Sequence, residues 1–261
     1  MISRLLLGML PLLQEDGFPN PPGQLEVFAQ ADVWFASIES SGRLENWFGK
    51  KGVGEEEDPR MSFHREGRLR DPAPVTGLEV AIVGENEKHQ WVGFRACVRY
   101  GTWSESGAVD AAFTIDGTTV PAGSPFRSRF KYQHYTLGGI AGVRPTSFPV
   151  ELWGWFGCTF HHEDFKMETV SGELKDGAGG LTFGIGGHAE IRPLPFLFAA
   201  VELSASIGFG VPETQAMICA GVAWGGVRLE AGYRHLWAAW DPDPDFRLSM
   251  GGPFVGLSVR F

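Results

Sequence analysis

Residues 252–261 read GPFVGLSVRF and alternate apolar with polar or small residues. One face of this stretch would carry Val255, Leu257, Val259 and Phe261, and the other Gly256, Ser258 and Arg260. This period of two is typical of a β-strand with one apolar face. Soluble domains usually end in a polar, loosely held segment, whereas this pattern continues to an aromatic last residue. The stretch therefore predicts a strand that is held within a closed sheet.

The composition favours an all-β protein. The 261 residues include 36 glycines and 20 phenylalanines, only 20% of the residues are charged, and the net charge is −9. Glycine-rich turns between many short strands indicate a sandwich or barrel. Nucleic-acid binders carry basic patches, so we expect no nucleic-acid partner. Cys97, Cys158 and Cys219 lack metal-site spacing and read as small buried or lipid-facing residues, with one disulfide as the alternative.

The first residues resemble a secretory signal peptide. Arg4 precedes an apolar run from Leu5 to Leu13, and polar residues and prolines follow. The run is too short to cross a membrane as a helix. We expect residues 1–20 to be a signal peptide and N-terminal segment, and residues 24–261 to form one domain. An ordinary disordered start is the alternative.

Ten segments show the strand period, and eight strands is the alternative count. The pattern slips near His134, where a β-bulge would account for the change. The ten segments are 26–37, 75–84, 91–103, 126–141, 150–162, 181–191, 196–209, 214–224, 226–237 and 252–261.

The connections alternate between short and long. Short turns are expected at 85–90, 143–149, 192–195 and 225–226. Long loops are expected at 39–74, 104–125, 162–178 and 240–250, with a moderate one at 209–213. Long loops on one side and short turns on the other are typical of an outer-membrane barrel.

One face of each strand is apolar and the other carries charges. In a membrane barrel the apolar face points outward, because lipid is the outer solvent. A soluble, lipocalin-like barrel would place the same apolar faces inward and is the alternative.

The C-terminal stretch of the chain resembles a feature of a known protein family. The stretch FVGLSVRF at 254–261 is similar to the assembly signal of Gram-negative outer-membrane β-barrel proteins, with Val259 and Phe261 as its signal residues. Residues 113–139 and 227–240 also resemble strand-and-loop patterns of small barrels of this kind, so the likeness covers roughly residues 25–261. The resemblance implies a closed antiparallel up-and-down barrel in the bacterial outer membrane. It implies membrane lipids and the outer-membrane assembly machinery as partners, and it carries no catalytic residues over.

The charged strand faces predict a charge network in the lumen. Buried charges persist only when they are paired, and the two signs nearly balance, so we expect a mostly plugged interior. A wide channel would need about 16 or more strands. The expected network comprises Asp32, Arg95, Arg99, Arg129, Lys131, Glu151, Glu190, Glu202, Arg228, Glu230 and Arg234.

No motif identifies a catalytic site, a metal site or a cofactor. Residues 161–165 read HHEDF and are expected at a solvated rim, with cation binding or hydrolysis as alternatives; neighbours on a strand point to opposite faces, so at most two share a site. His188 and Glu190 are expected to form a satisfied lumen pair, and the DPDPD stretch at 241–245 a rigid solvated loop. Aromatic girdles or ordinary packing would account for Trp34, Trp47, Trp103, Trp224, Trp237 and Trp240.

The sequence thus predicts an outer-membrane barrel with a structural or surface-interaction role. A narrow small-solute pore and a rim-located hydrolase are the alternative functions.

Overall fold

A computed structural model gives the structure of the chain. It describes residues 25–42, 61–62, 69, 72–86, 88–110, 112–115, 118–145, 149–170, 172–208, 212–239 and 247–261. The expected signal segment at 1–20, Trp47, Trp240 and the DPDPD stretch lie outside these residues. Within the described ranges, there is no helix long and apolar enough to cross a membrane.

Ten long strands and three short ones make up the described chain. The short ones are β2 (Met61–Ser62), β5 (Phe113–Ile115) and β6 (Thr118–Val120). The long ones are β1 (Leu25–Gly42), β3 (Ala73–Glu85), β4 (Gln90–Ala108), β7 (Pro125–Val143), β8 (Val150–Thr169), β9 (Gly172–Leu194), β10 (Leu197–Gly208), β11 (Glu213–Trp224), β12 (Val227–Ala239) and β13 (Arg247–Arg260).

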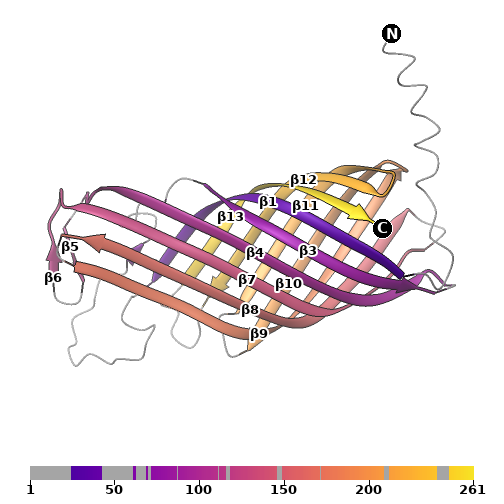
Figure 1. Ribbon diagram of the computed structural model, residues 1–261, viewed down its shortest axis with the longest axis horizontal. Coiled ribbons are helices and arrows are strands. Elements are labelled where there is room, and N and C mark those ends of the chain that lie inside the picture. Colours follow the sequence, from indigo (N-terminus) through magenta and orange to yellow (C-terminus); the bar gives the residue numbers. More distant parts are fainter. Residues whose placement is uncertain are drawn as a thin grey trace, which may run out of the picture.

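The long strands close into a barrel. They follow one another in the order β13-β12-β11-β10-β9-β8-β7-β4-β3-β1, and β13 also pairs antiparallel with β1 (Figure 1). Val259 lies opposite Ala29 on one side and opposite Val227 on the other. The C-terminal strand is therefore held on both edges. The predicted antiparallel up-and-down barrel of ten strands is confirmed, and the count of eight is wrong.

The two ends of the barrel differ, and we call them the turn end and the loop end. The turn end carries the short connections at 86–89, 144–149, 195–196 and 225–226. Gly225 and Gly226 have φ of 52° and 75°, the left-handed pair that a tight two-residue hairpin requires. The loop end carries the β5–β6 hairpin and the long strand extensions (Figure 1).

The barrel exposes apolar side chains and buries charged ones. On β4, Phe94 is 73% exposed while its neighbour Arg95 is 6% exposed. The same contrast separates Val201 at 45% from Glu202 at 6% on β10. Lipid must surround such a surface, because large apolar belts are not left in water. The outward orientation of the apolar faces is confirmed, and the lipocalin-like alternative is wrong.

Four neighbouring strands extend beyond the apolar belt at the loop end. β4, β7, β8 and β9 have 19, 19, 20 and 23 residues, against the roughly 9–11 that a tilted strand needs to cross a bilayer. The expected long loop at 162–178 is wrong: β8 continues to Thr169 and β9 starts at Gly172. Much of the expected loop at 104–125 also has regular structure, since β4 reaches Ala108 and the β5–β6 hairpin follows.

The pattern slip near His134 marks a change of solvent rather than a bulge. β7 pairs with β4 and β8 without a register shift, so the predicted bulge is wrong. Even-numbered side chains of β7 point inward along the strand. On the membrane side of His134 the outward residues are apolar, such as Leu137 at 66% exposed. Beyond it the apolar residues, such as Phe130, are inside and the basic ones are outside.

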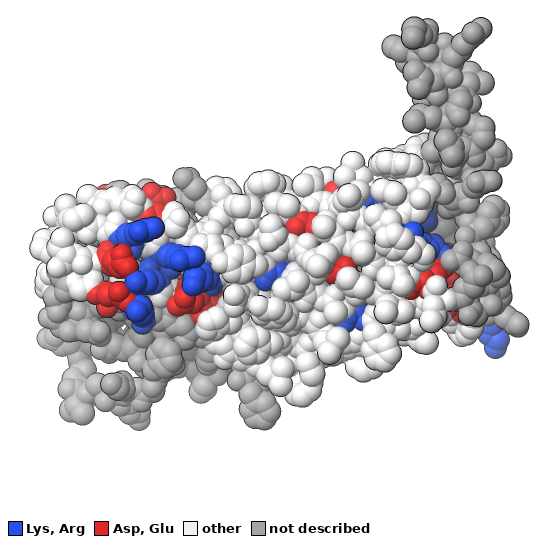
Figure 2. Space-filling model, viewed as in Figure 1, with Lys and Arg blue, Asp and Glu red and all other residues white. Residues whose placement is uncertain are grey.

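This reversal corrects two predicted network residues. Arg129 and Lys131 do not face the lumen; they lie on the outer face of β7 beyond the belt, where water is the outer solvent. Figure 2 shows charged side chains gathered at the loop end, next to a sparsely charged middle.

All three cysteines are free, with Cys97 and Cys219 buried and Cys158 half-buried, so the disulfide alternative is wrong. Trp34 and Trp103 are buried inside the barrel and cannot belong to a girdle. Trp224 at the turn end is 45% exposed and Trp237 at the loop end is 46% exposed, as girdle residues would be.

The boundary on β7 can be tested with one charge. We expect Leu137→Arg to destabilise the folded barrel by about 2–4 kcal/mol, because it places a cation in the lipid-facing belt. Gln133→Arg, on the same face of the same strand beyond the belt, should cost at most about 1 kcal/mol. Urea unfolding in lipid vesicles measures both, and equal costs would contradict the boundary.

Candidate functional site in the lumen

Most of the predicted network side chains lie inside the barrel, in the part nearer the turn end. Nine of the eleven predicted residues point inward, and Arg129 and Lys131 do not. Glu151 and Arg228 are half-buried. The remaining seven are all at least nine-tenths buried: Asp32, Arg95, Arg99, Glu190, Glu202, Glu230 and Arg234.

Arg95 joins three strands. Its Nη2 donates to Oε2 of Glu79 at 2.8 Å, and its Nη1 donates to Oε1 of Glu202 at 3.2 Å. These residues belong to β4, β3 and β10. The guanidinium also lies 5.3 Å and 5.6 Å from the ring centroids of Trp153 and Trp155. Such a cation–π arrangement adds to the pairing in a desolvated site.

A second group surrounds His188. Its ring stacks on Trp153 with centroids 4.5 Å apart. Nε2 lies 3.9 Å from Oε2 of Glu190, and Nδ1 lies 3.7 Å from Oε2 of Glu202. Glu190 also accepts hydrogen bonds from Arg192 at 2.6 Å and from Arg228. The structure thus places His188 beside Glu190 within a larger cluster than the sequence indicated.

A third group crosses the closing strand. Arg234 of β12 donates to both carboxylate oxygens of Asp32 of β1, at 3.1 Å and 3.3 Å. Gln30 donates to Glu230 at 2.7 Å across the same strand, β13. Gly256 of β13 makes room, because a Cβ there would lie 3.0 Å from Oε1 of Glu230. Side chains from β1 and β12 therefore connect over the seam of the barrel.

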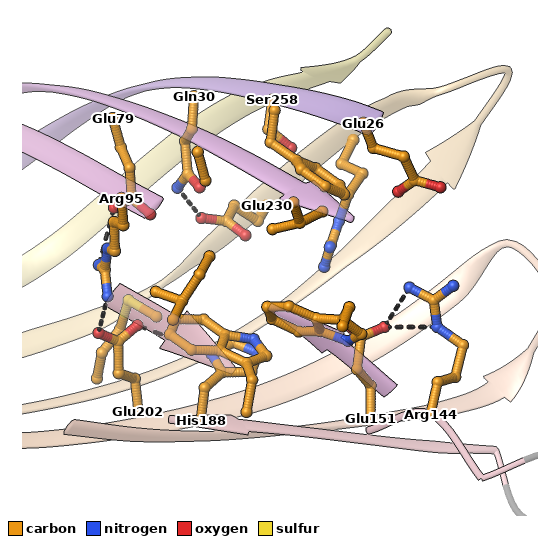
Figure 3. A pocket seen from close by; sticks show the side chains of 18 of the residues that line it. Glu26, Gln30, Glu79, Arg95, Arg144, Glu151, His188, Glu202, Glu230 and Ser258 are labelled. Carbon is orange, nitrogen blue, oxygen red and sulfur yellow. Dashed lines mark hydrogen bonds and ion pairs between the residues drawn. The ribbon is translucent and has the colours of Figure 1, made fainter. Parts of the chain in front are cut away.

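A cavity of about 120 Å³ lies between these groups. It extends from Arg144 and Glu151 near the turn end to Arg99 and Arg234 deeper in the lumen. Figure 3 shows Glu79, Arg95 and Glu202 linked at one end and Arg144 with Glu151 at the other. Polar side chains from many strands line this narrow space.

The HHEDF stretch is divided between the two faces of β8. His162 and Asp164 point outward, whereas His161 and Glu163 are 0% and 1% exposed inside the barrel. The expectation of a solvated rim is therefore wrong for His161 and Glu163, because β8 continues far past the belt. Nearby, Nε2 of His134 lies 3.2 Å from Oε2 of Glu213. Across the described residues, no three His, Cys, Asp or Glu side chains are grouped to hold a metal ion.

Apolar side chains fill the lumen on the loop side of these polar groups. Trp103 packs on Phe130 with ring centroids 5.6 Å apart, and its Nε1 donates to the carbonyl of Ala36 at 2.9 Å. Sequence reasoning missed this apolar cluster, although the inversion of charges on β7 signals it. The cluster includes Trp34, Ile38, Trp103, Phe126, Phe130, Tyr132, Phe165, Met167, Leu236, Leu248, Met250 and Phe254.

Neither a protein-family model nor a curated protein matches the chain. Among solved structures it is similar to Ail, the attachment invasion locus protein of Yersinia pestis, at 13% identity and a TM-score of 0.37, over 92% of this chain and 99% of that one. It is similar to a major outer membrane protein of Thermus thermophilus at 14% identity and a TM-score of 0.40, over 91% and 100% of the chains. Neisserial surface protein A gives 13% identity and a TM-score of 0.34, over 90% and 97%. These likenesses concern the barrel shape only.

The chain is a transmembrane β-barrel of the bacterial outer-membrane type. Its own surface decides this: strands close without a free edge, the belt facing outward is apolar, and charged groups are inside. Lipids of that membrane are the surroundings of the belt.

The pairing of Arg95 should be essential for stability. We expect Arg95→Met to destabilise the barrel by about 3–5 kcal/mol, because it leaves Glu79 and Glu202 close together without their cation. Arg129→Met removes the same charge from the outer face of β7 and should change stability by at most about 0.5 kcal/mol. Urea unfolding in vesicles measures both; a mild effect at Arg95 would show that water replaces the cation.

Proposed function

We propose that this barrel is a membrane anchor with a blocked lumen that presents a charged sheet outside the cell, in a structural or surface-interaction role. The observation that carries this proposal is the apolar cluster inside the loop end. Water-filled channels have polar interiors, whereas here aromatic and aliphatic side chains occupy the lumen beyond the ion pairs.

The extended part of β7, β8 and β9 supports a surface role. Its outer face carries ion pairs between Lys131 and Asp164 at 3.5 Å and between Lys166 and Glu173 at 3.1 Å. Hydrogen bonds from Lys175 and Lys166 hold the pKa of Glu173 below its usual value. These ion pairs join neighbouring strands on the part of the outer face that lies beyond the apolar belt.

Arg127 and Arg129 add further positive charge to this surface. Both are exposed on β7 and form no ion pair with a described residue. Each exposed arginine offers several donors that suit carboxylate, sulfate or phosphate groups. A partner with negative charge therefore fits this face better than a basic one.

The pore alternative makes a different prediction for conductance. We expect the purified chain to produce no steady current across a planar lipid bilayer, because the apolar cluster excludes hydrated ions. A shift of the band on a gel after boiling shows that the sample contains the folded barrel. Discrete, lasting steps of current from such a sample would favour the small-solute pore and contradict the blocked lumen.

The surface role can be tested with a soluble polyanion. We expect cells that express the barrel to bind fluorescent dextran sulfate, and Arg127→Gln with Arg129→Gln to reduce that binding about threefold or more, since each exposed ion pair contributes about 0.2–1 kcal/mol. Lys88→Gln removes a charge at the turn end, on the other side of the membrane, and should leave binding unchanged. Equal binding by both variants would contradict the assignment to this face.

A further inference from the structure

The lipid-facing surface of the barrel carries an apolar pocket where the belt meets the loop end. Its volume is about 410 Å³, and it is lined from β3, β4, β7, β8 and β9. Tyr135 of β7 and Phe160 of β8 stand on its loop side, with ring centroids 6.1 Å apart. Ala96 of β4 forms the floor, because its paired neighbours on β3 and β7, Val80 and Leu137, have larger side chains. The outer surface is therefore hollowed at one place in the belt.

A row of hydrogen-bonding side chains begins immediately beyond this pocket, and we call it the polar row. Tyr100, Gln133 and His162 lie opposite one another on β4, β7 and β8, two residues closer to the loop end than Tyr135. Two residues correspond to about 7 Å along a strand, so the polar row lies where the hydrocarbon gives way to lipid headgroups. The hydroxyl of Tyr100 accepts a hydrogen bond from Thr102 at 2.9 Å, which leaves its own proton for another acceptor.

Positive charge prevails on the outer face beyond the polar row. Lys131 comes next on β7; its Nζ lies 3.5 Å from Asp164, and its side chain is 34% exposed, so the ammonium group can also reach a second anion. One row farther, Arg129, Lys166 and Lys175 lie opposite one another on β7, β8 and β9. Among the described outward side chains of these three strands, lysines and arginines outnumber carboxylates beyond the polar row. A headgroup with net negative charge complements this surface better than a zwitterionic one.

We propose that the pocket binds one hydrocarbon chain of an anionic membrane lipid in the leaflet at the loop end, with the phosphate of that lipid between the polar row and Lys131. A chain that fills the hollow gains close contacts with several strands at once. The ammonium group of Lys131 and the donors of the polar row suit phosphate oxygens. This site goes beyond the anchoring role, and it does not depend on whether the loop end binds a soluble polyanion.

Native mass spectrometry of the full-length folded barrel, released from detergent micelles, tests the proposal. The probes are dipalmitoyl phosphatidylglycerol and dipalmitoyl phosphatidylcholine, which have the same chains and differ in the net charge of the headgroup. We expect one retained phosphatidylglycerol per barrel. Phosphatidylcholine should bind about two- to fivefold more weakly, the range that one exposed ion pair supplies.

Matched variants separate the pocket from the charge. Ala96→Leu fills the floor and should weaken the binding of both lipids about threefold or more, because the chain loses its contacts. Ala199→Leu adds the same side chain to the outward face of β10, away from the pocket, and should bind lipid as the unchanged chain does. Lys131→Gln should weaken the binding of phosphatidylglycerol alone, about two- to fivefold, whereas Lys88→Gln at the turn end should not. The gel shift on boiling shows that each variant is folded.

Three results would overturn the site: no retained lipid, equal binding of the two lipids by the unchanged chain, or unchanged binding in Ala96→Leu. Dimers that Ala96→Leu abolishes would also overturn it, and would assign the pocket to a second copy of the chain. Cells that express Ala96→Leu should still bind dextran sulfate, because the pocket faces lipid. Failure of the lipid site and failure of the surface role are therefore separate results.

Discussion

Closure of the sheet by the β13–β1 pairing is the constraint on which the rest of the structure depends. Hydrocarbon offers no partner for backbone N–H and C=O groups, so a sheet crosses a membrane only without free edges. Twelve residue pairs join β1 to β13. Once this seam is closed, alternate side chains within the apolar belt face the interior and the lipid, so the charged residues at the level of the belt have no place except the lumen.

The interior of the barrel is filled in two ways. Near the turn end, arginines and carboxylates from strands far apart in sequence neutralise each other, as Arg95 does with Glu79 and Glu202. Near the loop end, aromatic and aliphatic side chains fill the space. The two regions meet at the level of His134 and Arg99, where polar groups are buried but incompletely paired.

The extension of β7, β8 and β9 shows how one strand serves two solvents. Side chains keep the same inward and outward alternation along β7. Only the residue types change, from charged inside and apolar outside to the reverse. A sequence pattern reports which face is apolar, and it does not report which solvent lies outside. For this reason the alternation predicts a lumen position for Arg129 and Lys131 and a solvated rim for His161 and Glu163, and each prediction is wrong.

The sequence by itself determined the all-β class, the ten strand segments, the sides of the short turns and which face of each strand is apolar. These follow from local period and turn residues, which need no knowledge of distant contacts. The tertiary structure alone decided which charges meet, because partners such as Asp32 and Arg234 are brought together only by closure of the barrel. It also decided that Arg129 and Lys131 lie outside the lumen, since a balance of charges along the chain says nothing about which groups come within hydrogen-bond distance.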